Sequence, residues 1–121
     1  MTPKPANPPL TDAVVTLLPS IIEQAREAAR EHGYAIAIHG SLRRDIDLIA
    51  APWVEDASPA EVLVEAVRQA VHGFIVDADL PESGARVERN PEQKPHGRLA
   101  WAIHLVGYGT WIDLSVMPRL Q

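Results

Sequence analysis

Hydrophobic residues recur at helical spacing in two stretches of the chain, and each stretch predicts an amphipathic helix. The first stretch begins near Thr11 and stops at Gly33, and it contains Pro19, where we expect the helix to kink or restart. The second stretch begins with Ser58-Pro59-Ala60-Glu61, which combines an N-cap serine, a proline in the first turn and a capping-box glutamate. We expect this second helix to end before Gly73.

Alternation of large residues with small or polar ones predicts strands over residues 34–39, 45–51, 99–105 and 111–116. The first two are joined by Gly40-Ser41-Leu42-Arg43-Arg44, a length compatible with a hairpin, and a turn at residues 106–109 leads into the last strand. Prolines and glycines interrupt residues 74–97, where we expect a long loop with a short strand around residues 86–88.

These elements predict an α/β (α+β) fold, in which a mixed, largely antiparallel sheet of about four strands carries two main helices on one face. Four of the first nine residues are proline. This composition predicts a flexible arm over residues 1–10, followed by a single domain over residues 11–121.

The composition narrows the possible functions. The chain of 121 residues is 46% hydrophobic with a formal net charge of −5, which disfavours an extended nucleic-acid surface and binding to an anionic membrane. The absence of cysteine excludes disulfides, thiolate nucleophiles and zinc sites of the cysteine type, so any metal must have oxygen or imidazole ligands. There is no secretory-signal pattern and no apolar run long enough to span a membrane, so we expect a cytoplasmic protein.

Three aspartates interrupt apolar strands. Asp45 and Asp47 lie on one face of the second strand, with attachment points roughly 6 to 7 Å apart, and Asp113 interrupts the last strand in the same way. Crowded carboxylates raise each other's pKa unless they are protonated, paired or bound to a metal, and Mg²⁺ or Mn²⁺ would resolve the conflict. The alternative is that Asp45 and Asp113 pair with arginines and Asp47 is half exposed. Three such residues together favour the metal.

The faces of the strands support a ligand site. If the alanines and histidines of residues 34–39 and 99–105 share the carboxylate face, that face combines small side chains with acids and imidazoles and leaves room for a ligand. The alternative is that the alanines admit a closely packed helix. His39 and His104 are candidates to bind phosphate or a metal-bound carboxylate, although a histidine satisfied within the core is commoner. Trp111 could stack on a nucleobase, although packing is its commoner role.

Lys94-Pro95-His96-Gly97-Arg98 forms a basic segment within the expected loop. It could close over an anion or remain an ordinary solvent-exposed loop. His32 and His72 lie near the predicted helix C-termini, so we assign them to capping and surface roles.

The motifs Ile38-His39-Gly40-Ser41, Asp45-Ile46-Asp47-Leu48 and Ile112-Asp113-Leu114 together resemble the nucleotidyltransferase superfamily related to DNA polymerase beta. The resemblance implies a mixed sheet flanked by helices and three carboxylates that hold two Mg²⁺ ions. By position, it implies that Asp45 and Asp47 bind metal. It also implies that Asp113 binds the second metal and helps to activate the acceptor hydroxyl, and that Gly40 and Ser41 contact the phosphates of the nucleotide.

Only Leu42, Arg43 and Arg44 separate the Gly-Ser pair from the first aspartate, whereas family members usually have more residues there, often a helical turn. Arg43 and Arg44 are therefore candidates to bind phosphate in place of that helix N-terminus, and the alternative is that they are solvated turn residues. The chain also has no room for a further acceptor-binding domain. It resembles a minimal member of the superfamily, similar to small bacterial and phage proteins.

The first hypothesis is a metal-dependent nucleotidyltransferase-like protein that transfers a nucleoside monophosphate from an NTP to the hydroxyl of an acceptor, which could be a protein, an RNA or a small molecule. The second is a catalytically degenerate, phage-derived member of the same fold that acts as a binding or regulatory module. A metal-dependent phosphohydrolase with the same carboxylates is a third. The sequence contains no P-loop, no His-Glu-x-x-His pair and no nucleophile elbow.

Overall fold

The computed structural model of the chain describes residues 8–88 and 91–119. Residues 1–7 of the predicted arm lie outside the described residues, whereas Leu10 packs against the core and its N–H donates to the carbonyl of Arg43. The elements are α1 (Asp12–Glu31), β1 (Tyr34–His39), β2 (Ile46–Pro52), α2 (Ala60–Ile75), β3 (Gly84–Val87), β4 (Glu92–Gln93), a 3₁₀ turn (Pro95–Gly97), β5 (Leu99–Val106) and β6 (Thr110–Val116).

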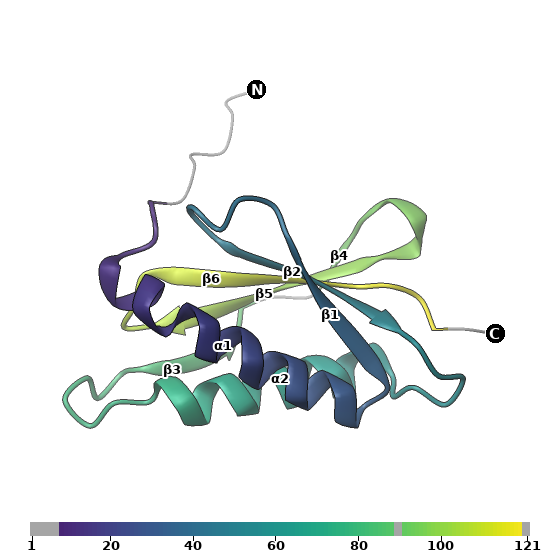
Figure 1. Cartoon of the computed structure of the whole chain (residues 1–121), viewed down its shortest axis with the longest axis horizontal. Helices are drawn as coiled ribbons and strands as arrows, with labels where there is room; N and C mark the ends of the chain where they lie inside the picture. The colour runs from purple at the N-terminus through teal and green to yellow at the C-terminus, as the bar shows by residue number, and fades with distance from the viewer. Residues whose placement is uncertain (1–7, 89–90, 120–121) are drawn as a thin grey trace.

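The strands form one open, mixed sheet in the order β1-β2-β6-β5-β3, with β4 also paired to β5 (Figure 1). Strands β2 and β6 are parallel, and the other pairings within the sheet are antiparallel. The parallel pair lies at the centre of the sheet. β1 pairs with one edge of β2, and after α2, β3, β4 and β5 the chain pairs β6 with the other edge. This crossover brings two distant segments of the sequence side by side.

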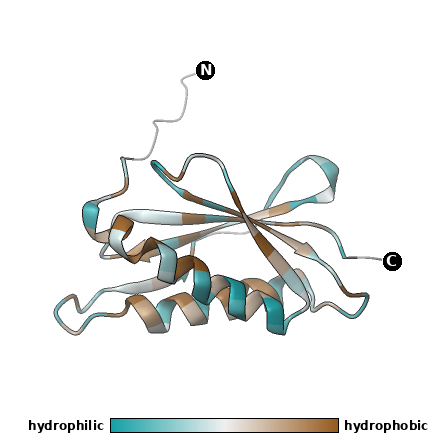
Figure 2. Ribbon diagram, viewed as in Figure 1, coloured by the Kyte–Doolittle hydropathy of each residue, from teal (hydrophilic) through white to brown (hydrophobic). Residues whose placement is uncertain are grey.

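Both helices lie on the same side of the sheet (Figure 1). They are amphipathic, as the alternation of hydrophobic and hydrophilic residues around them in Figure 2 illustrates. The apolar side chains of β2, β5 and β6 alternate with polar or small ones, and the apolar set is buried beneath the helices. This set consists of Ile46, Leu48, Trp101, Ile103, Leu105, Ile112 and Leu114. We call the opposite face of the sheet the open face, because neither α-helix of residues 8–88 and 91–119 lies on it.

The expected fold class is confirmed at the level of a mixed, mostly antiparallel sheet with two helices on one face, but the expected number of strands is too low. In the part of the chain that the structure describes, the sheet has six strands. The additional β3 and β4 lie within residues 74–97, which were expected to be mainly a loop. β3 overlaps the short strand expected around residues 86–88, whereas β4 was not expected. Both are short and pair with β5, and this pairing orders them.

The bounds of helix α1 agree with the sequence pattern, but the helix does not restart at Pro19. Thr11 is its N-cap and its hydroxyl oxygen accepts from the N–H of Val14, and Pro19 lies inside the helix. The predicted capping box of α2 is wrong. Its N-cap is Pro59 without a side-chain hydrogen bond, and the hydroxyl of Ser58 instead lies 2.9 Å from His32 Nδ1.

Helix α2 also continues past Gly73, where the sequence predicted its end. Its last turn includes Ile75, which is 2% exposed. Burial of this side chain in the core favours one further helical turn and outweighs the helix-weakening effect of the glycine. Within the described residues, neither helix is long and apolar enough to cross a membrane.

Candidate functional site

The strand register places the candidate residues in adjacent positions of the open face. His39 is the partner of Asp47 across β1 and β2, and Asp47 is the partner of Asp113 across β2 and β6. Asp113 is in turn the partner of Ala102 on β5. Directly paired residues present their side chains on the same face of a sheet, so two carboxylates and an imidazole form one row beside a small residue.

Asp47 and Asp113 are therefore neighbours in space although they are far apart in the sequence. Adjacent strands lie about 4.8 Å apart, which puts the two carboxylates within reach of a single cation. The sequence predicted the face on which each aspartate lies. The pairing of β2 with β6 is what brings them together.

The electrostatic state of the row reflects this crowding. The pKa of Asp47 is raised, first by burial and then by the negative charges of Asp113 and Asp45. The pKa of Asp113 is also raised, and loss of water around its carboxyl is the largest cause. Asp45 and Glu92 raise the pKa of Asp113 further. The folded protein therefore destabilises the ionised form of these carboxylates relative to water. A bound cation would stabilise that form.

A cavity of about 220 Å³ opens over the row, lined by His39, Asp47, Leu48, Lys94, Arg98, Asp113 and Ser115. The two cations come from the segment between β4 and β5, and both lower the pKa of Asp113. Lys94 Nζ also lies 3.3 Å from Glu92 Oε1. Carboxylates and cations thus line the same cavity, an arrangement that can bind a metal ion and phosphate oxygens together.

Gly40 lies directly against this site. It has a φ of +79°, and a Cβ built on it would lie 3.0 Å from Asp47 Oδ2. The left-handed backbone favours glycine at this position, and a larger residue would also crowd the Asp47 carboxylate. Gly40, the first residue of the Gly-Ser turn, is therefore close to the carboxylate of Asp47.

The other predicted site residues in the segment between β1 and β2 do not all lie near this row. Ser41 and Asp45 belong to the segment between β1 and β2, and the charge of Asp45 acts on both Asp47 and Asp113. Arg43 and Arg44 instead line a separate hollow with Leu42 and the residues that precede α1. The cavity over the aspartates does not include them.

His104 lies next to the row rather than in it. Its Nδ1 lies 3.0 Å from Glu88 Oε1, and its ring stacks on that of Trp111. Trp111 Nε1 donates to Glu88 Oε2 over 3.1 Å. His104 therefore has a carboxylate partner of its own on the open face, which the sequence did not predict.

The protein side chains at this site can supply two carboxylate ligands to Mg²⁺ or Mn²⁺. Among residues 8–88 and 91–119, no group of three or more His, Asp or Glu side chains has the arrangement of a metal centre. Mg²⁺ is commonly bound by one or two carboxylates together with substrate phosphates and water, so a pair of opposed aspartates is a sufficient protein contribution. Asp47 and Asp113 are the residues that would hold it.

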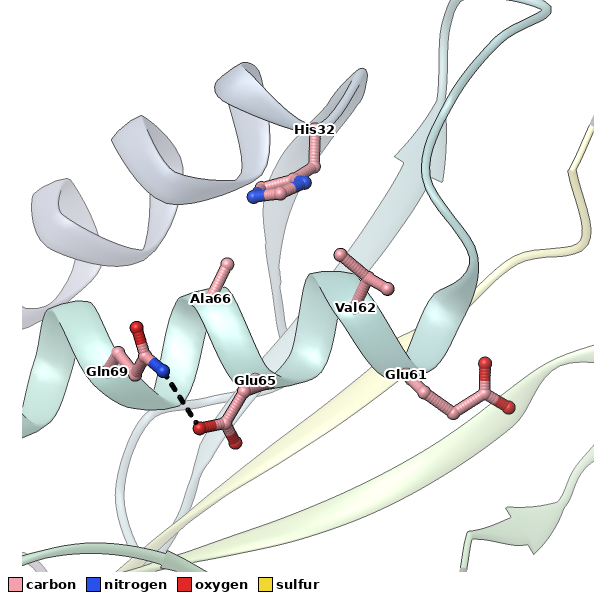
Figure 3. A pocket seen from close by; sticks show the side chains of 6 residues that line it. All are labelled: His32, Glu61, Val62, Glu65, Ala66 and Gln69. Carbon is pink, nitrogen blue, oxygen red and sulfur yellow. Dashed lines mark hydrogen bonds between the residues drawn. The ribbon is translucent and has the colours of Figure 1, made fainter.

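A larger hollow of about 390 Å³ lies on the helical side, between His32 at the end of α1 and one face of α2 (Figure 3). Val62 and Ala66 face the imidazole, whereas the carboxylates of Glu61 and Glu65 point away from it (Figure 3). Glu65 also accepts hydrogen bonds from Arg68 and Gln69. This hollow is mainly apolar and contains no converging reactive groups.

Three residues of the site escaped prediction as individual ligands: Lys94, Arg98 and Ser115. The basic composition of the segment that contains Lys94 and Arg98 indicated that this loop could close over an anion. Ser115 shares the face of Asp113 by strand alternation. No protein-family model matched the chain, and a comparison with curated proteins found no match.

Proposed function

We propose that the protein is a metal-dependent nucleotidyltransferase-like protein that transfers a nucleoside monophosphate from an NTP to a hydroxyl acceptor. The observation that carries the proposal is the direct register pairing of Asp47 with Asp113 on the parallel strands β2 and β6. The charge of Asp45 raises the pKa of both Asp47 and Asp113, which supports a shared site for the three carboxylates. Contact between Gly40 and Asp47 adds the Gly-Ser turn to the same site.

Each residue has a role in this proposal. Asp47 and Asp113 would hold the metal with Asp45 beside them, and a bound divalent metal supplies charge neutralisation at the phosphates of the nucleotide. Lys94 and Arg98 bind phosphate oxygens at the other side of the cavity. Asp113 or solvent takes the proton of the acceptor hydroxyl, whose attack on the α-phosphate displaces pyrophosphate.

The size of the cavity limits what it can enclose. At about 220 Å³, it is smaller than the roughly 300–1,000 Å³ typical of small-molecule sites. It suits metal and phosphate groups, and the remainder of a nucleotide would lie along the open face.

The second candidate is a catalytically degenerate member of the same fold that binds a nucleotide or a protein without turnover. Two observations favour it. The connection between β1 and β2 is short, and the described residues contain no three-ligand metal group. Both candidates share the fold and differ in whether a metal-bound nucleotide reacts.

Thermal unfolding in the presence of Mn²⁺ and each NTP tests the proposal, because a ligand that binds only the folded protein raises its melting temperature. We expect stabilisation by Mn²⁺ and NTP together in the wild-type protein and its loss in Asp47→Ala. Asp56→Ala is the matched control, since Asp56 is exposed in the segment after β2. Equal stabilisation of wild type and Asp47→Ala would contradict the proposed site.

Turnover separates the two candidates. Incubation with Mn²⁺ and labelled NTPs is expected to release pyrophosphate and label an acceptor, in a reaction that Asp47→Ala abolishes. Binding without pyrophosphate release across all four nucleotides and a range of protein, RNA and small-molecule acceptors would favour the degenerate binding module.

A further inference from the structure

A second cluster on the open face consists of Glu88, His104 and Trp111. The two rings are parallel to within 8°, with centroids 4.5 Å apart. Each oxygen of the Glu88 carboxylate binds one of the rings, at 3.0 Å from His104 Nδ1 and 3.1 Å from Trp111 Nε1. One carboxylate therefore fixes the orientation of both rings, and we call this pair of rings the aromatic shelf.

The shelf adjoins the aspartate row. Trp111 precedes Asp113 by two residues on the same face of β6, which separates their attachment points by about 6 to 7 Å. Because Ile46 pairs with Ile112, Asp45 and Trp111 are the residues that immediately precede this pair on the two parallel strands. The shelf and the candidate metal site are therefore within the length of one nucleotide.

The stacking direction decides which ring face is available. His104 and Trp111 are partners across the neighbouring strands β5 and β6, so the stack runs across the strands. One face of the indole is covered by His104. The other face is turned toward β2, the strand that carries Asp47 and follows the Gly-Ser turn.

We propose that the nucleobase of the bound nucleotide stacks on this face of Trp111, an inference that rests on the proposed function. Aromatic side chains bind bases of any sequence through their π-faces, and an indole already fixed by Glu88 loses little freedom when a base binds. A purine covers more of the indole than a pyrimidine does. ATP and GTP are therefore expected to bind more tightly than CTP and UTP.

The test compares ATP with inorganic triphosphate, which has the phosphates but no base. Isothermal titration in the presence of Mn²⁺ is expected to show that the wild-type protein binds ATP about tenfold more tightly than triphosphate. In Trp111→Ala the two ligands are expected to bind with similar affinity, while the affinity for triphosphate stays near the wild-type value. Trp53→Ala is the matched control, because Trp53 is 60% exposed and lies beyond the opposite end of β2.

Glu88→Ala is a second variant, which releases both rings without truncating either, and it is expected to reduce the preference for ATP. Equal binding of ATP and triphosphate by the wild-type protein, or an unchanged preference in both shelf variants, would overturn the shelf and leave the proposed function intact. Failure of both ligands to bind the wild-type protein with Mn²⁺ would overturn the proposed function, and the shelf with it.

Discussion

At the scale of single residues, the pairing of Asp47 with Asp113 places two like charges opposite each other on neighbouring strands. Like charges in this position destabilise a sheet. Burial is the largest cause of the raised pKa of both carboxyls, and the charge of Asp113 raises the pKa of Asp47 further. The protein retains both acids on its open face. A bound cation would offset the repulsion between the two carboxylates.

Removal of one charge should therefore stabilise the metal-free protein. Asp113→Asn keeps the shape of the side chain and is expected to raise the free energy of unfolding at pH 7 by about 0.5 kcal/mol, measured by urea denaturation. Asp56→Asn, on an exposed segment, is expected to change it little. A lower stability of Asp113→Asn would mean that Lys94 and Arg98 already compensate the charge.

Gly40 combines a left-handed backbone conformation with a position close to the Asp47 carboxylate. Gly40→Ala is expected to lower the free energy of unfolding by about 1–2 kcal/mol, because of its positive φ, and to weaken Mn²⁺ binding, because the new methyl group presses on Asp47 Oδ2. Gly109→Ala is the control, since Gly109 has a φ of +63° but no neighbouring atom within 4 Å of a built Cβ. If both variants bind Mn²⁺ equally, the contact between Gly40 and Asp47 does not shape the site.

At the scale of elements, α1 shows how tertiary packing overrides a local signal. Pro19 lies inside this helix, where it removes one backbone hydrogen bond, yet the helix runs without interruption from Asp12 to Glu31. Val14 and Ile21, on either side of the proline, are at most 1% exposed. Burial of apolar side chains before and after Pro19 favours a continuous helix.

Pro19→Ala tests this balance. The substitution restores a backbone donor and is expected to raise the free energy of unfolding by about 1–3 kcal/mol in urea denaturation, without changing Mn²⁺ binding. Unchanged or lower stability would show that the helix accommodates the proline without cost.

The elements also show what local sequence can reveal. Alternation in β2 and β6 predicted which face carries each aspartate, because the period of a strand is a local property. The capping box at Ser58 was wrong because the hydroxyl of Ser58 lies against His32 and its carbonyl accepts from the hydroxyl of Tyr34. These contacts join segments that are distant in sequence, and no local pattern contains them.

At the scale of the whole molecule, the crossover through α2 creates the candidate site. The sequence could predict two strands with acids but not that β6 lies beside β2 in parallel register, because strand order depends on the packing of the complete chain. The same reason explains why Lys94, Arg98 and Glu88 were not predicted as neighbours of the acids. Their positions depend on how β3 and β4 pair with β5.

The response of the whole protein to pH follows from the raised pKa values of Asp47 and Asp113. The folded state binds protons at these carboxyls more readily than the unfolded chain does, so their contribution makes the metal-free protein more stable as pH falls from neutral toward the raised values. A metal ion requires the ionised carboxylates, so stabilisation by Mn²⁺ should decrease over the same interval. Thermal unfolding from about pH 7 to about pH 5, with and without Mn²⁺, measures both trends. A Mn²⁺ effect independent of pH would place the ion elsewhere.

The proposed function depends on a divalent cation bound between the carboxylates of Asp47 on β2 and Asp113 on β6. Anomalous diffraction at the manganese edge, from crystals grown with Mn²⁺ and a non-hydrolysable ATP analogue, tests it directly. We expect a peak about 2.2 Å from carboxylate oxygens of both Asp47 and Asp113. Ordered nucleotide with no peak between these two residues, or manganese bound only at other carboxylates, would contradict it.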